Sequence, residues 1–260
     1  MSSTTERTGI RLDVVDNVAV VTIDAPPVNA FTMARYRLLR DTFRELGGRT
    51  DVHCAVLTAA GTKAFCAGLD VHEFLAAPIG DDPARQELGA ETFVAIKQCA
   101  LPVIAAVNGP ALGAGCVFAA LSDIRIASER ATFGLPEINV GRCGGAAYVG
   151  AVLPQGLVRR MFFTGEAISA HEAHRVGFVE EVVPPHRLMP AALELAEVIA
   201  RKSPLGLRIG KESLNATEGL TAHEGYLVEQ GYSTRLLATE DSREALRAVV
   251  EKRAPVFRGL

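Results

Sequence analysis

The residues that could do chemistry in this 260-residue chain gather in three short segments. Two are rich in small residues: AFCAGLD, with Ala67-Gly68, and NGPALGAGC, with Gly113-Ala114-Gly115. The third, ATFGLPEINVG, carries one acid, Glu137, among apolar neighbours. Backbone N–H groups at tight turns can stabilise an oxyanion, and a carboxylate beside them can move a proton. The three segments together suggest proton transfer next to a carbonyl group.

The glycine-rich run Gly113–Gly115 has three interpretations on its own. A phosphate-binding loop is disfavoured because the run lacks both the G-x-G-x-x-G spacing and a Walker lysine. Close helix packing would need small residues only to save space. An oxyanion site would use the unpaired N–H groups and the dipole of a helix N-terminus. The last two interpretations remain open from this run alone.

The other two segments are equally ambiguous when taken singly. Ala67-Gly68 forms a small-residue turn after a strand predicted at Cys54–Thr58, and could supply a second N–H donor or be a plain turn capped by Asp70. Glu137 is either a surface loop residue or a carboxylate in an apolar pocket. In a pocket, desolvation would raise its pKa and suit it to proton transfer.

The elements that must position these segments alternate between strands and helices. Alternating apolar residues around Asp16-Asn17 predict a β-hairpin. Helical spacing predicts helices over Met33–Leu46 and 84–100, and buried strands are expected over 54–59, 102–109 and 123–128. Beyond Gly144 the chain is mainly helical, interrupted by VEEVV, and ends in two helices within 220–253. This pattern predicts one α/β unit, with a core over 1–197 and a helical extension over 198–260.

Composition excludes several other classes of function. The formal net charge is −3, which does not favour nucleic-acid binding, and no apolar run is long enough to cross a bilayer. The five cysteines stand singly, and the six histidines form no plausible set of ligands, so neither a disulfide scaffold nor a metal site is expected. We therefore expect a soluble cytoplasmic protein without a metal.

The order of the three motifs resembles that of the enoyl-CoA hydratase/isomerase (crotonase) superfamily. The resemblance runs from PPVNAF near the start to AVVEKRAPVF at the end. It implies a right-handed spiral of ββα units with a helical C-terminal region that forms a trimer, and often a dimer of trimers. It also implies an acyl-CoA substrate and no separate cofactor, because coenzyme A is part of the substrate.

The resemblance also implies roles for individual residues. The N–H groups of Ala67 and Ala114 would hold the thioester oxygen as it becomes an enolate, and Glu137 would be the acid/base. Coenzyme A would pass the substrate-binding positions, which are Val28, Ala30, Ala64, Gly68, Leu69, Asp70 and Gly113. Lys252 matches a lysine that reaches the CoA phosphates, sometimes from a neighbouring subunit; otherwise it is a solvated helix charge.

One departure from the family pattern concerns the reaction itself. Family hydratases carry a second glutamate, as in GGGCE, and this chain has Val117 at that position. Two carboxylates hold the water that hydration adds, whereas one suffices to shift a double bond. Hydratase, isomerase, and thioester or carbon–carbon hydrolase activities all stay open.

Two further questions also stay open. The groups that could compensate for the missing acid are Tyr148, Arg142, Cys143, His72 and Glu73. An acyl-CoA-binding protein with little catalysis is a further alternative, and a purely structural oligomer subunit is another.

Overall fold

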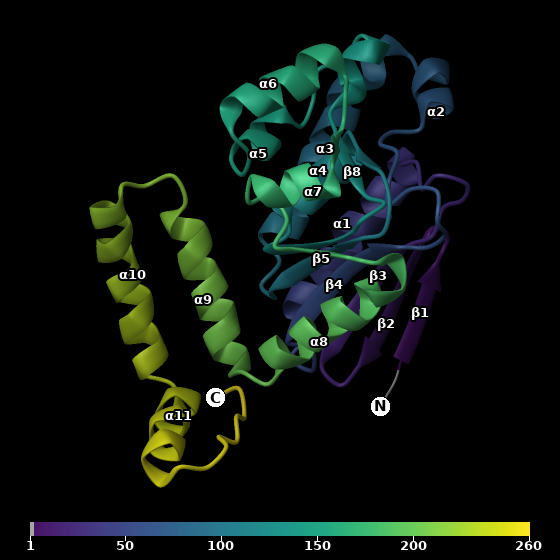
Figure 1. Cartoon of the computed structure of the whole chain (residues 1–260). Helices are drawn as coiled ribbons and strands as arrows, with labels where there is room; N and C mark the ends of the chain where they lie inside the picture. Colours follow the sequence, from purple (N-terminus) through teal and green to yellow (C-terminus); the bar gives the residue numbers. More distant parts are fainter. Residues whose placement is uncertain (1–2) are drawn as a thin grey trace.

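A seven-stranded β-sheet forms the body of the molecule (Figure 1), for which a computed structural model describes residues 3–260. The strand order is β1-β2-β3-β4-β5-β7-β10. The first three strands pair antiparallel, and the pairs from β3 to β10 are parallel. The strands are β1 (Ser3–Arg7), β2 (Ile10–Val15), β3 (Val18–Ile23), β4 (Cys54–Ala59), β5 (Val103–Val107), β7 (Ile124–Ser128) and β10 (Glu181–Val183).

Helices cover both faces of this sheet because its central strands are apolar on both sides. In β4, Ala55 and Leu57 point to the core shared with α1 (Met33–Gly48) and α4 (Ala114–Leu121). Cys54 and Val56, which alternate with them, face α8 (Leu188–Ala200) instead. This alternation follows from the two-residue period of a strand, and burial on both faces is typical of parallel sheets.

A small second sheet and a set of helices complete the body. The small sheet contains β6 (Ala111–Leu112), β8 (Thr132–Gly134) and β9 (Ile168–Ser169), in the order β6-β8-β9. The remaining helices of the body are α2 (Val71–Ala76), α3 (Asp82–Lys97), α5 (Ala146–Gly150), α6 (Gln155–Thr164) and α7 (Ala170–Arg175), with short 3₁₀ turns at 79–81, 136–140 and 185–187.

The predicted elements are present, with small shifts at their ends. The hairpin turn is made by Asp16 and Asn17, whose φ angles of 49° and 67° suit a two-residue turn. The short elements α2, β6, β8 and β9 have no counterpart among the predicted elements. Their two to six residues are too few to show a periodic pattern.

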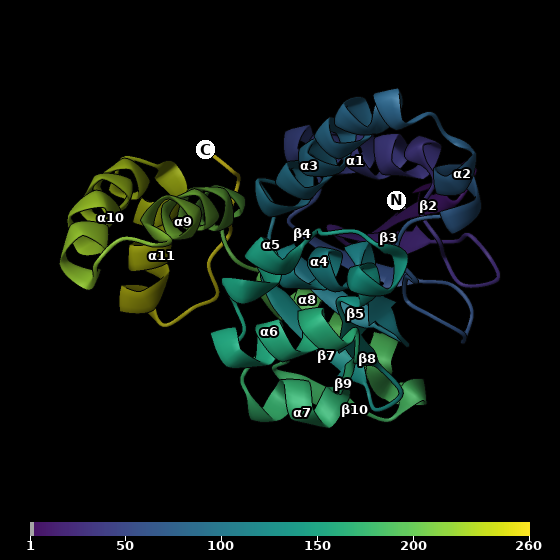
Figure 2. The ribbon, with the colours of Figure 1, turned by 90° about the horizontal axis from the view of Figure 1, so that it is seen from above.

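The C-terminal helices α9 (Pro204–Thr217), α10 (Ala222–Leu237) and α11 (Glu240–Glu251) form an arm that stands away from the body (Figures 1 and 2). The boundary expected after residue 197 lies inside α8, whose alanines pack on the large sheet, so the arm starts at α9. Lys211 of α9 fastens the arm: its Nζ, buried, lies 2.7 Å from Asp123 Oδ2 and 2.8 Å from the Leu101 carbonyl oxygen.

Candidate active site

Three parallel segments bring the three sequence motifs to one edge. Ala111 of β6 pairs in parallel with Cys66 on one side and with Phe133 of β8 on the other. Parallel segments end at the same edge of a sheet, so the residues that follow each one become neighbours. Those residues are Ala67-Gly68, Gly113-Ala114 and the turn that carries Glu137. The three motifs, which are separate in the sequence, therefore lie together in one site.

The two amide groups expected to hold an oxyanion differ in their present hydrogen bonding. Ala114 is the first residue of α4, so its N–H has no acceptor within the helix. The N–H of Ala67 donates to the Val28 carbonyl at 3.1 Å. A substrate oxygen at this site would therefore share or replace that bond, whereas the Ala114 amide is directly available.

Glu137 lies at the second position of the 3₁₀ turn Pro136–Val140 and is half-buried. Its Oε2 is shielded from solvent and has no hydrogen-bond partner among residues 3–260. Desolvation by burial raises the pKa of this carboxyl above its ordinary value. An uncompensated buried oxygen with a raised pKa is suited to accept and return a proton.

The glycines of this region serve different purposes. A β-carbon at Gly115 would collide with the carbonyl of Cys66, so Gly115 is needed for close packing. Gly113 instead has φ +55°, and a β-carbon there would stand 3.2 Å from Glu137 Oε1. The packing and the oxyanion interpretations of the run are thus both compatible with the structure, at adjacent residues.

Val117, at the position where the resemblance implies a second acid, is buried. A β-carbon at Gly145, which has φ +73°, would collide with Cγ2 of Val117. The valine therefore packs against Gly145, and it lines the same cavity as Glu137.

A cavity of about 380 Å³ opens in front of Glu137. Its wall includes Ala67, Gly68, Leu69, Gly113 and Ala114 from the predicted set. Much of the remaining lining is aromatic or apolar, and includes Met33, Tyr36, Val71, Phe74, Phe93, Val117, Val140 and Tyr148. Such a volume with few polar groups is typical of small-molecule sites.

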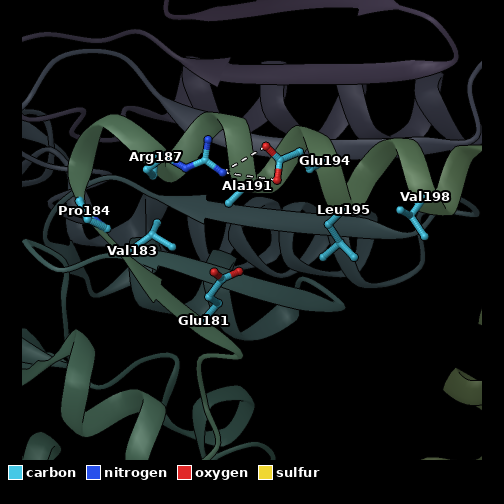
Figure 3. Close-up of a pocket in the computed structure, with 8 residues that line it drawn as sticks. All are labelled: Glu181, Val183, Pro184, Arg187, Ala191, Glu194, Leu195 and Val198. Atoms are coloured by element: carbon cyan, nitrogen blue, oxygen red, sulfur yellow. Dashed lines mark hydrogen bonds and ion pairs between the residues drawn. The ribbon is translucent and has the colours of Figure 1, made fainter.

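A second hollow of about 430 Å³ lies between β10 and α8 (Figure 3). Its charged residues are Glu181, Arg187 and Glu194, and the last two pair with each other at 3.2 Å. Figure 3 shows Leu195 and Val198 of α8 continuing this groove along the helix. It contains none of the residues expected to be functional.

The other predicted substrate-binding residues lie outside the cavity lining. Val28 and Ala30 are half-buried, Ala64 is buried, and Asp70 caps α2 by accepting from the N–H groups of His72 and Glu73. Lys252, exposed, follows α11 in the arm, away from α2 and α3 (Figure 1). Their contacts with coenzyme A stay predictions.

Asn29 was not expected to matter, yet it positions the segment around Val28. Its side chain accepts from the Ala25 N–H and donates to the carbonyls of Ala60 and Ala64. It is buried, with φ +55°. A single asparagine in PPVNAF thus joins two segments that the resemblance places along coenzyme A, and asparagine is one of the few residues that tolerate this backbone conformation.

The groups considered as substitutes for the missing acid separate into two sets. Tyr148, Arg142 and Cys143 line the cavity, whereas His72 is exposed and Glu73 accepts a hydrogen bond from the Met33 N–H at 2.8 Å. Tyr36 and Arg85, which were not predicted, also line the cavity. Burial raises the pKa of the Tyr36 hydroxyl, so it keeps its proton.

The described residues hold no cluster of metal ligands, and two buried cysteines of the motifs keep their protons. Residues 3–260 contain no group of three or more His, Cys, Asp or Glu side chains placed to hold a metal. Burial raises the pKa of the Cys66 and Cys116 thiols to about 12, so both stay protonated. Among these same residues, no helix combines the length and apolar character needed to cross a membrane.

Comparisons with known proteins agree over nearly the whole length. A family model described as enoyl-CoA hydratase/isomerase matches residues 13–259. A short-chain-enoyl-CoA hydratase of Clostridium acetobutylicum is 34% identical, covering 95% of this chain and 97% of its own. A (7aS)-7a-methyl-1,5-dioxo-2,3,5,6,7,7a-hexahydro-1H-indene-carboxyl-CoA hydrolase of Mycobacterium tuberculosis is 36% identical, covering 90% and 95%. The crystal structure of an enoyl-CoA hydratase from Bacillus anthracis superposes with a TM-score of 0.92 at 31% identity, covering 97% and 100%.

Proposed function

The chain belongs to the enoyl-CoA hydratase/isomerase family, and we propose that it shifts a double bond in acyl-CoA thioesters, using Glu137 alone to move the proton. The observation that carries this proposal is the shielded Oε2 of Glu137, which has no hydrogen-bond partner among residues 3–260. The buried Val117 supports it, because the resemblance implies a second acid at that position. One carboxylate is sufficient for an isomerase, whereas hydration also needs a held water.

The proposed steps balance without any other reactant. The thioester carbonyl oxygen accepts hydrogen bonds from the N–H groups of Ala114 and Ala67. Glu137, ionised, takes a proton from C2 of a 3-enoyl-CoA, and the electron pair moves onto the thioester oxygen to give a dienolate. Protonated Glu137 then returns the proton to C4, which leaves the double bond between C2 and C3.

A direct comparison of two substrates tests the proposal. Purified protein is given 3-hexenoyl-CoA and crotonyl-CoA, and the products are separated by chromatography. We expect isomerisation to exceed hydration by about a hundredfold or more, in the range that one acid/base group contributes. Faster hydration would overturn the proposal. Tight acyl-CoA binding with no turnover would support the non-catalytic binding protein instead.

Hydrolysis of an acyl-CoA is the second candidate, and one relative supports it. The M. tuberculosis protein, 36% identical, is a carboxyl-CoA hydrolase. In this chain Glu137 would act as base toward a water in the cavity. A thioester hydrolase would release free CoA. A carbon–carbon hydrolase would give a ring-opened product that keeps the thioester. Either product would distinguish hydrolysis from isomerisation.

We also propose that the arm forms contacts between subunits, as a trimer or a dimer of trimers. Supporting this, α10 and α11 carry large apolar side chains that are exposed in a single chain, among them Leu227, Leu246, Val249 and Val250. Exposed apolar clusters of this kind mark association surfaces. Lys252, at the end of α11, would then reach the CoA phosphates of a neighbouring subunit.

The five cysteines are all free, and four of them are buried. This supports a reducing compartment, and we propose the cytoplasm.

A further inference from the structure

Two arginines lie against one phenylalanine ring in the wall of the cavity. The guanidinium carbon of Arg142 is 4.5 Å from the centroid of Phe74, and that of Arg85 is 5.6 Å from the same centroid. They come from different parts of the chain: Phe74 from α2, Arg85 from α3, and Arg142 from the segment after Glu137. All three line the cavity that contains Glu137.

Positive charge is in excess at this end of the cavity. Arg142 Nη2 donates to Asp82 Oδ1 at 2.6 Å, so one of the two arginines is neutralised. Arg85 is half-buried and makes no ion pair within residues 3–260, and its guanidinium lies over the face of Phe74. The only other charged residue in the lining as described is Glu137.

This arrangement matches a carboxylate better than an alkyl end. Guanidinium groups bind carboxylates through two parallel N–H donors, and only one donor of Arg142 is occupied by Asp82. An apolar group packed against Arg85 would remove water from the guanidinium without replacing its hydrogen bonds, which is unfavourable. The neighbouring side chains of Val71 and Phe93 suit the methylene groups that would precede the carboxylate.

We propose that the acyl group of the substrate ends in a second carboxylate, and that Arg85 and Arg142 bind this group beside Phe74. The inference rests on the proposed function only for the thioester end of the ligand. The phosphates of coenzyme A are the competing anions. Of the positions along which the resemblance places coenzyme A, Val28, Ala30 and Ala64 lie outside the lining, whereas Gly68, Leu69 and Gly113 belong to it. Binding of free CoA is therefore measured as well.

Binding of saturated thioesters tests this inference without any need for turnover. Adipoyl-CoA and hexanoyl-CoA have the same chain length and differ at the end that carries the carboxylate. Calorimetric titrations of both, and of free CoA, are made with the full chain. Neither thioester contains a double bond that could be shifted or hydrated, so the result does not depend on which reaction is catalysed.

We expect the wild type to bind adipoyl-CoA at least about tenfold more tightly than hexanoyl-CoA, the size expected for a charge-assisted hydrogen-bonded pair. Arg85→Gln and Arg142→Gln should each reduce this ratio by about threefold or more, with free CoA binding unchanged. Arg201→Gln, at an arginine that is 76% exposed and pairs with Glu197, is the matched control and should leave the ratio as it is.

Three results would overturn the inference. Equal or weaker binding of adipoyl-CoA by the wild type is the first, and an unchanged ratio in both variants is the second. The third is that the arginine variants lose the same binding affinity for both thioesters and for free CoA, which would assign the arginines to the CoA phosphates. Because Arg85 has no ion pair to lose among the described residues, Arg85→Gln remains informative if Arg142→Gln fails to fold.

Discussion

The carboxylate of Glu137 rests against Gly113, with Oε1 3.2 Å from the point where a β-carbon of residue 113 would stand. Because Gly113 immediately precedes Ala114, the acid lies beside the helix N-terminus that offers the free amide. The group proposed to transfer the proton and the amide proposed to stabilise the anion therefore lie side by side.

Replacing Glu137 by glutamine should abolish turnover without abolishing binding. The amide keeps the size of the side chain but cannot take a proton, and general-base catalysis contributes about 10²- to 10⁴-fold. We expect kcat to fall by at least about a hundredfold, while the Kd for hexanoyl-CoA changes little. Glu129→Gln, at an exposed acid, is the control. Undiminished activity of Glu137→Gln would remove Glu137 from the mechanism.

Gly113→Ala should lower kcat by more than its loss of stability explains. An alanine there has an unfavourable positive φ and also crowds Glu137 Oε1. Gly141→Ala is the control, since Gly141 has φ +70° and open space around its β-position. Gly141→Ala, in the left-handed region, should lose about 1–2 kcal/mol of unfolding free energy. Gly113→Ala, with φ 55° and ψ −119°, lies outside that region and should lose about 1–3 kcal/mol, both measured by urea denaturation. Only Gly113→Ala should lose about tenfold or more in kcat; equal activities would contradict the proposed crowding.

Val117→Glu should confer hydration of crotonyl-CoA. The new carboxylate stands where family hydratases have their second acid and could hold a water opposite Glu137. Overpacking against Gly145 should cost about 1–3 kcal/mol of stability. Val117→Gln has nearly the same size without the charge and should gain no hydration. A folded Val117→Glu variant without hydratase activity would show that the missing acid is not what limits hydration.

Activity should depend on pH through Glu137, because burial raises the pKa of its carboxyl. The ionised form takes the proton, so kcat/KM should fall as pH drops through this raised pKa, above the ordinary value of about 4.3. Stability should show the opposite trend. Because the pKa of Glu137 is higher in the folded than in the unfolded state, the stability of wild type relative to Glu137→Gln should be greatest at low pH and fall as pH rises through the raised pKa. Thermal melts of both proteins across pH would test it.

Lys211→Met should loosen the arm from the body. It removes one partner of an ion pair in which Lys211 is 5% and Asp123 27% exposed, at 2.7 Å. We expect Lys211→Met to lose about 2–4 kcal/mol of unfolding free energy. This is at the low end of the range for breaking a buried ion pair, because Asp123 is partly solvated. Lys97→Met breaks the more exposed pair with Glu218 and should cost at most about 1 kcal/mol. Comparable losses in the two variants would contradict the anchoring role.

The sequence was sufficient for the longer strands and helices and for the three segments that carry the candidate site residues. The turn with Ala67 and the run with Ala114 each follow a predicted strand. The strand before Glu137, β8, is too short to show a pattern, and the sequence left the surroundings of Glu137 open. Asp16-Asn17 specified the hairpin through local backbone preference alone.

The part of the cavity lining that comes from helices α1, α2 and α3 could not be predicted in this way. Tyr36, Phe74 and Arg85 belong to helices whose rotation about their own axes is decided by packing against residues distant in the chain. The bond from the Ala67 N–H to the Val28 carbonyl likewise depends on how Asn29 holds its loop.

The reacting groups sit on the ends of paired strands, whereas Phe74, Arg85 and Arg142 come from α2, α3 and the turn after the acid. Apart from Arg142, which closely follows Glu137 in the chain, the residues proposed to select the acyl group belong to helices and not to strand ends. Mutations that reshape α2 and α3 could redirect this scaffold to a different acyl group while the proton-transfer apparatus is inherited unaltered.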